Sequence, residues 1–228
     1  PYFGIKDVEL GLEETTLKLT SMHVSWHFVD ETLLAEHGFV KEGKLFCGRK
    51  GYSILVIPKV LTMDKTTEAY ISEFLKQGGR LFAPYGLPEY LEGQKHDYSA
   101  WTFSSDLTTL RGIDGFSCPD GLDYRLSVRT DKNGEEYLFV MNASEKEIPL
   151  SFAKKGMHGF SSLDVETLKR SPLPLKFVLG KGESRILYWT ANAAPEKRDL
   201  PKIKLPKTYR LCSPVDNFLT LDQLSYSF

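Results

Sequence analysis

The chain has 228 residues, of which 41% are hydrophobic and 26% are charged, a composition typical of folded globular proteins with one large or two smaller domains. A formal net charge of −1 argues against nucleic acid or an acidic membrane surface as a partner, and no apolar run is long enough to span a membrane. The three cysteines are far apart and form neither a CxxC motif nor a disulfide framework, so the sequence favours a soluble protein of a reducing compartment such as the cytoplasm.

The first part of the chain mixes helix and strand patterns. Residues 13–22 carry a helical pattern, and residues 24–29 alternate apolar and polar side chains, which predicts a half-buried strand. Asp30 is placed to cap a short helix over Glu31–His37. A small hairpin that turns at residues 42–43 is expected next.

Residues 52–86 contain the clearest pattern in the chain, a strand, a helix and a second strand. The apolar run 54–57 is typical of a strand buried on both faces, and Pro58 ends it because proline has no N–H group for the ladder. The helix has cap residues at both ends, and a second strand over 80–83 completes a right-handed βαβ unit with parallel strands. Residues 1–118 are therefore expected to form an α/β domain.

The stretch 87–121 connects this unit to the rest of the chain. Its patterns predict a short helix over 87–93, a strand around 101–103 and a helical turn over 106–111. The run DGFSCPDG at 114–121 is turn chemistry and indicates a domain boundary.

From residue 122 the apolar pattern changes to the period of two that is typical of strands. Two alternating stretches flank an Asn-Gly pair at 133–134, which is a strong hairpin signal. Further short strands are expected at 148–152, 159–164, 175–179 and 184–189. Strands at this spacing predict an antiparallel β-sandwich over 119–190. Residues 191–228 are interpreted as a linker and the start of a further β domain.

No common catalytic or cofactor motif is present: GxSxG, GxGxxG, Walker A and HExxH are all absent, so the sequence predicts no catalytic residue, cofactor or metal site. In open α/β sheets, ligands bind beyond the carboxyl ends of the parallel strands. Asp30, Glu31 and Tyr85 follow such ends and are candidate ligand-binding residues. The more ordinary interpretation of Asp30 is a helix cap, and Lys59 at the remaining strand end is expected to be simply solvated.

Three aromatic residues close together in the sequence, Tyr98, Trp101 and Phe103, form another candidate site. Such a cluster suits stacking on a sugar ring, which makes Trp101 the fourth candidate ligand-binding residue. Aromatic side chains at this density more commonly bury the contact between two domains.

The segment that runs from HFVDETLLAEHGFV to QGGRLFAPYG resembles the flavodoxin-like accessory domain of large glycoside hydrolases, above all α-L-rhamnosidase-like and β-galactosidase-like proteins. The matching residues of this segment are Phe28, Val29, Asp30, Tyr52, Leu55, Val56, Pro58, Gly78 and Gly79. His27 departs from the family pattern, which has an aspartate there. The β-sandwich that follows in such enzymes is matched by Asn142, Ser144, Asp164 and Thr167, and residues 214–228 resemble the beginning of a jelly-roll-like domain.

The resemblance implies an accessory role, because the catalytic carboxylates of those families lie in a barrel that precedes this region. The flavodoxin-like fold also resembles class I glutamine amidotransferases, which place a cysteine nucleophile after a strand. This chain has Ala-Pro-Tyr-Gly at the corresponding residues 83–86, and the missing thiol argues against amidotransferase activity.

Three hypotheses about function follow. The first is a non-catalytic internal segment of a glycoside hydrolase, with a preceding catalytic barrel and a following β domain as partners in the same chain. The second is a stand-alone module that binds an oligosaccharide or another partner. The third is an independent glycosidase that uses Asp30 or Glu31 with Glu89 or Glu92, which requires two carboxyl groups about 5 to 10 Å apart.

Overall fold

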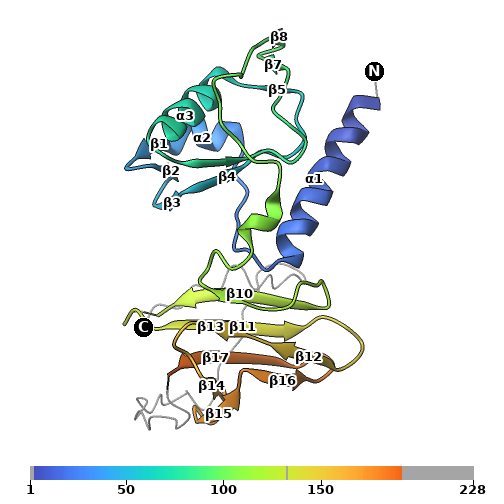
Figure 1. The fold of residues 1–228 in the computed structure, drawn as a ribbon, viewed down its shortest axis with the longest axis vertical. Helices are drawn as coiled ribbons and strands as arrows, with labels where there is room; N and C mark the ends of the chain where they lie inside the picture. The colour runs from blue at the N-terminus through green and yellow to red at the C-terminus, as the bar shows by residue number, and fades with distance from the viewer. Residues whose placement is uncertain (1–2, 132, 192–228) are drawn as a thin grey trace, which may run out of the picture. The chain divides into compact units, whose positions relative to one another are not determined.

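The computed structural model describes residues 3–131 and 133–191, and it begins with one long helix, α1 (Phe3–Ser21) (Figure 1). The helix is longer than the stretch that its sequence pattern indicates. The strand expected over 24–29 is wrong, because these residues join no sheet. Their alternation arises from packing: Val24 and Trp26 lie against a core cluster that includes Leu19 of α1, whereas Phe28 is 68% exposed.

A short helix and a small antiparallel sheet follow as expected. Asp30 Oδ1 accepts a hydrogen bond from the N–H of Leu33 at 2.8 Å and so caps α2 (Glu31–His37). The sheet consists of β1 (Gly38–Lys41), β2 (Lys44–Cys47) and β3 (Lys50–Tyr52). Its first turn has φ values of +53° at Glu42 and +71° at Gly43, as a two-residue turn of this hand requires.

The βαβ unit is confirmed. Strands β4 (Ile54–Val56) and β6 (Arg80–Phe82) pair in parallel, and α3 (Lys65–Lys76) connects them. The helix buries Thr67, Ile71 and Phe74, which fall on one stripe. Strand β4 is half-buried, however, and not buried on both faces as its apolar run indicates.

The parallel sheet is small in the part of the chain that the structure describes. Beyond β4 and β6, its further parallel contact is a bridge between Phe82 and Ser104. The mixture of α/β and β structure is therefore confirmed, whereas the wider strand order of a flavodoxin-like sheet is not confirmed.

The connecting stretch differs from its prediction. The helix expected over 87–93 is wrong, because the turn at Glu92 and Gly93 has φ values of +48° and +78° and joins two short strands. The small sheet there contains β5 (Thr62–Met63), β7 (Tyr90–Leu91) and β8 (Gln94–Lys95). The strand expected around 101–103 is also wrong, whereas the helical turn η1 (Leu107–Leu110) is confirmed.

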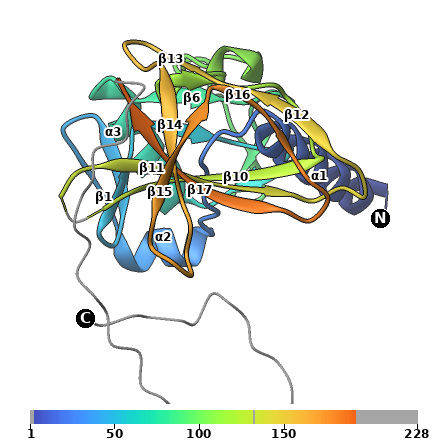
Figure 2. The same ribbon diagram turned by 90° about the horizontal axis from the view of Figure 1, so that it is seen from below.

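The second half of the described chain is antiparallel β structure around one hydrophobic cluster. Figures 1 and 2 show its main sheet and, on one side of it, a second layer that contains β12 and β16. The main sheet has the order β10 (Tyr124–Thr130), β11 (Glu136–Asn142), β17 (Ser184–Thr190), β14 (Gly159–Leu163) and β15 (Arg170–Pro174). The second layer pairs β12 (Ile148–Ser151) with β16 (Lys176–Leu179), and β9 (Phe116–Ser117) pairs with β13 (Ala153–Lys154).

Strand β11 buries one of its two apolar faces. Leu138, Val140 and Asn142 are buried, whereas Phe139 and Met141 point outward and remain exposed. Both faces of this strand are apolar in sequence, so the alternation alone does not define the inner one.

The two turn motifs of the resemblance have local structural roles. Asn142 Nδ2 donates to the carbonyl groups of Lys146 at 2.7 Å and Gly180 at 2.8 Å, and its Oδ1 accepts from the N–H of Ser144 at 2.8 Å. Asp164 Oδ1 accepts from the N–H of Thr167 at 2.9 Å. Each side chain thus holds a turn of the β structure together.

The predicted domain boundaries stay predictions. The linker and further β domain expected over 191–228 lie outside the described residues apart from Ala191.

Candidate functional site

The carboxyl ends of β4 and β6 are covered by the chain's own first helix. Lys59 Nζ forms an ion pair with Asp7 Oδ2 at 3.3 Å, and the Tyr85 hydroxyl donates a hydrogen bond to the carboxylate of Glu14. This hydrogen bond raises the pKa of Tyr85 to about 12. A Cβ atom on Gly11 would lie 2.4 Å from the Cβ of Lys59, so glycine permits the close approach of the helix. The edge at which ligands of open α/β sheets usually bind is therefore occupied by α1.

The two acidic candidates, Asp30 and Glu31, have structural partners. Asp30 caps α2, and Glu31 Oε1 accepts a hydrogen bond from the N–H of Asp64 at 2.9 Å, at the start of α3. Glu31 therefore ties the beginnings of two helices together. Among the described residues, no hydrogen bond or ion pair joins either acid to Tyr85 or Trp101.

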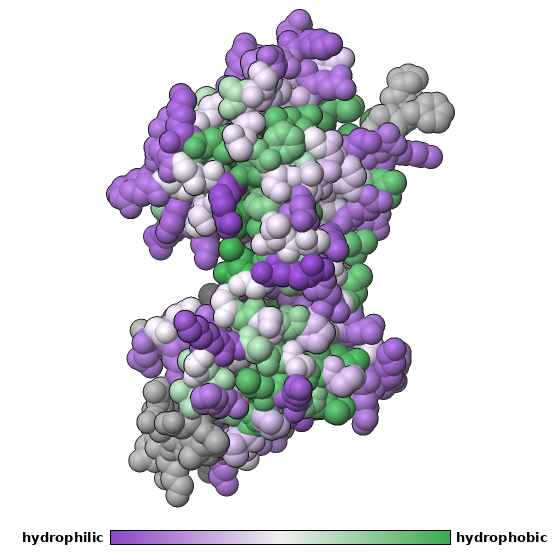
Figure 3. Space-filling view, in the orientation of Figure 1, coloured by the Kyte–Doolittle hydropathy of each residue, from purple (hydrophilic) through white to green (hydrophobic). Residues whose placement is uncertain are grey.

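The fourth candidate, Trp101, lines an open pocket of about 600 Å³, which we call the Trp101 pocket. Its walls come from α3, from Gly79 and β6, and from the segment 96–104, which in Figure 1 follows β8 along the chain. Figure 3 shows apolar surface among charged side chains in the half of the view that holds α3 and β6. The pocket has the size typical of a small-molecule site.

Hydrogen bonds fix the aromatic wall of the pocket. Trp101 Nε1 donates to Ser72 Oγ at 3.0 Å, and this hydroxyl donates to Glu68 Oε1 at 2.9 Å. The Tyr98 ring packs 4.8 Å from the Trp101 ring, centroid to centroid. Tyr98 is only 6% exposed and is part of the core, whereas Phe103 is 41% exposed beside the pocket. One ring of the aromatic cluster is thus buried, and another is exposed at the pocket.

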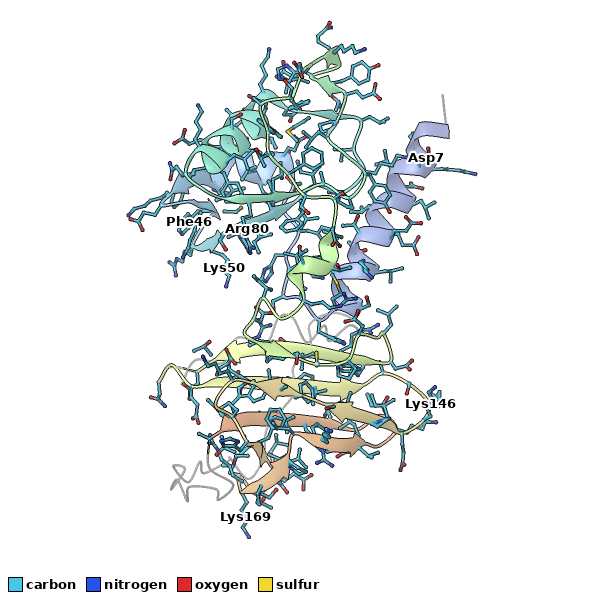
Figure 4. All side chains as sticks on the ribbon, in the orientation of Figure 1. Asp7, Phe46, Lys50, Arg80, Lys146 and Lys169 are labelled. Atoms are coloured by element: carbon cyan, nitrogen blue, oxygen red, sulfur yellow. The ribbon has the colours of Figure 1, made fainter. Side chains whose placement is uncertain are left out.

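Charged side chains surround the pocket. Lys76 and Arg80 are exposed, and neither forms an ion pair with a residue that the structure describes. Asp97 accepts hydrogen bonds from the N–H and the hydroxyl of Ser99, which lower the pKa of its carboxyl group. Figure 4 shows Arg80 on the sheet, apart from α1 with its labelled Asp7.

The pocket joins residues that are far apart in sequence, and sequence reasoning found only its aromatic part. Lys76 and Arg80 lie at the end of a helix and the start of a strand, where a basic residue has an ordinary explanation. Their positions next to the aromatic segment depend on the tertiary fold, so no local pattern indicates them.

A second, much smaller cavity of about 60 Å³ lies beside His23. Burial lowers the pKa of His23 to about 4, and its Nε2 has no hydrogen-bond partner among the residues that the structure describes. Its ring packs on Tyr124 with 4.1 Å between the centroids. The cavity has room for a few water molecules but not for a sugar ring.

Over the described ranges, no group of three or more His, Cys, Asp or Glu residues is arranged to hold a metal ion. Within the same ranges, no helix is both long enough and apolar enough to cross a membrane.

The described residues form a mixed α/β and β protein that has an open, partly aromatic pocket. Comparison with protein families gives no matching model, and comparison with curated proteins gives no match. Among solved structures, the chain is similar to the apo exo-carrageenase GH42 from Bacteroides ovatus, with a TM-score of 0.56 and 14% sequence identity. The similarity covers 79% of this chain and 26% of that chain, so it extends over about a quarter of the enzyme's length.

Proposed function

We propose that this chain is a non-catalytic accessory region of a glycoside hydrolase. The observation that carries the proposal is the structural similarity to the exo-carrageenase, because it includes most of this chain and only 26% of that one. A region of this size leaves room for a separate catalytic part in such an enzyme. Similarity of fold is an analogy, so the side chains must support the role independently.

The carboxylates of the chain support an accessory role. Asp30 caps a helix and Glu31 binds a backbone N–H group. Glu92 pairs with Lys65 at 2.8 Å, which lowers the pKa of its carboxyl group, whereas a general acid needs a raised pKa. Glycoside hydrolysis requires two facing carboxyl groups that are free to act on the substrate.

In this proposal, a catalytic barrel precedes the α/β part and a β domain follows the antiparallel part within one longer protein. The α/β part is a reduced member of the flavodoxin-like group. The parallel pairing of β4 and β6 across α3 supports this relationship.

The proposal is tested by assaying the purified chain on a panel of aryl glycosides. We expect no release of the aryl group above the buffer rate. Turnover that disappears in Asp30→Asn and persists in Glu36→Gln, an exposed acid on the same helix, would refute the accessory role.

The second candidate function is binding of an oligosaccharide by the chain itself. The observation that favours it is the position of Trp101 in an open pocket of about 600 Å³. Because α1 covers the usual ligand edge of the sheet, this pocket is the better-supported place for a ligand.

A further inference from the structure

We propose that the Trp101 pocket binds a saccharide that carries an acidic substituent, either a carboxylate or a sulfate ester. The choice of a saccharide rests on the proposed function, and the acidic substituent goes beyond it.

The aromatic wall is prepared for a ligand. The bond from Trp101 Nε1 to Ser72 holds the indole in one orientation, and the bond from Ser72 to Glu68 holds the hydroxyl in turn. A wall that is already ordered reduces the entropy lost on binding. Phe103 adds an exposed ring from the same segment. Aromatic rings of this kind pack against the apolar C–H faces of sugar rings.

Two cations at the pocket favour a negatively charged ligand. Lys76 ends α3 and Arg80 begins β6, and both line the pocket across the short turn that joins these elements. The described part of the chain gives neither of them an acidic partner. The planar guanidinium of arginine binds carboxylates and sulfates through two parallel hydrogen bonds, and lysine adds a point charge.

Among the described residues, neither Glu68 nor Asp97 forms an ion pair with Lys76 or Arg80. Glu68 accepts the Ser72 hydroxyl, and Asp97 accepts two hydrogen bonds from Ser99. Both carboxylates therefore accept hydrogen bonds from residues close to them in the sequence. An acidic ligand would complete the pocket by pairing with Lys76 and Arg80.

The test is a titration of the isotope-labelled full chain, followed by NMR at the indole N–H signals. The probes are a galacturonic acid tetrasaccharide, a sulfated galactan tetrasaccharide, a neutral cellotetraose and inorganic sulfate. We expect saturable shifts of the Trp101 signal with at least one acidic saccharide, and much weaker effects of the neutral one and of free sulfate. The acidic saccharide that binds identifies the preferred substituent as a carboxylate or a sulfate ester.

Variants separate the pocket from the rest of the surface. Arg80→Gln should weaken binding about tenfold, because one charge-assisted hydrogen bond to the ligand is lost. Phe103→Ala should weaken it about fivefold through lost stacking. The matched controls are Arg49→Gln and Phe28→Ala, exposed residues outside the pocket, which should leave the affinity unchanged.

Two results would overturn the proposal. One is the absence of a saturable shift with both acidic saccharides in a chain with dispersed signals, and the other is equal binding of the neutral tetrasaccharide. Neither result affects the accessory role, which is refuted by hydrolysis and not by lack of binding. Failure of the two proposals is thus distinguishable in the same sample.

Discussion

Replacing Gly11 by alanine sets two known effects against each other. In an ordinary helix interior, this change stabilises a protein by about 1 kcal/mol, because alanine has the higher helix propensity. Here the new Cβ would lie 2.4 Å from the Cβ of Lys59, whereas ordinary contact begins at 3.4 Å, so α1 and the chain at Lys59 must separate by about 1 Å. Overpacking of this kind costs about 1–3 kcal/mol. The movement also disturbs the ion pair of Asp7 and the hydrogen bond of Glu14, and we expect a net loss of about 1 kcal/mol.

The measurement is urea unfolding of the single and double variants, followed by circular dichroism. The contact is with the first side-chain atom of Lys59, so Lys59→Gly removes the clash. In that background, Gly11→Ala should stabilise the chain by about 1 kcal/mol, whereas it should destabilise the chain that keeps Lys59. Equal effects of Gly11→Ala in both backgrounds, or a stabilised Gly11→Ala single variant, would show that α1 does not press on the strand end.

Three further predictions concern single side chains. Burial lowers the pKa of His23 to about 4, whereas an unfolded histidine titrates near 6.5, so the unfolded chain binds more protons between these values. Between pH 6.5 and pH 4, the chain should lose roughly 1.5 kcal/mol of stability. This is about half of the free energy that corresponds to the full pKa difference, because the adjacent cavity allows the charge to be screened. His23→Asn should flatten this part of the plot of urea midpoint against pH. Asn142→Ala should cost about 2–4 kcal/mol in thermal unfolding, because the buried carbonyl of Leu179 and two partly buried carbonyl groups lose their donor. The exposed Asn133→Ala should cost almost nothing. Glu31→Ala should cost about 1 kcal/mol through the lost bond to the N–H of Asp64, and an unchanged melting temperature would contradict that role.

Local chemistry predicts many elements of this fold. Asp30 caps its helix, the positive φ at Gly43 fits a short hairpin turn, and the stripe with Ile71 and Phe74 packs α3 on the sheet. In each case the determining interaction lies within a few residues of the signal, so a sequence pattern carries it.

The errors arise where distant contacts decide the structure. Residues 24–29 have a strand pattern, but Val24 and Trp26 pack against α1 and the η1 turn without a neighbouring strand to pair with. The unexpected edge strand β15 contains Pro172 and Pro174, and prolines conceal a strand in sequence although an edge accepts them.

The candidate site also combines features that local sequence predicts with features that depend on distant contacts. Trp101 stands out in the sequence as an aromatic residue in a cluster, whereas the role of Lys76 and Arg80 depends on the packing of α3 and β6 beside that cluster. The covering of the strand ends by α1 has one local sign, a glycine inside a helix, which commonly marks close packing.

The central claim is that the chain binds an acidic saccharide in the Trp101 pocket and does not cleave it. One NMR experiment tests both parts: the labelled chain is incubated with the acidic tetrasaccharides while the Trp101 indole signal and the reducing-end signals of the sugar are followed together. We expect a saturable shift of the Trp101 signal that Arg80→Gln weakens, and no new reducing ends over time. New reducing ends that depend on Asp30, or a Trp101 signal that never moves, would contradict it.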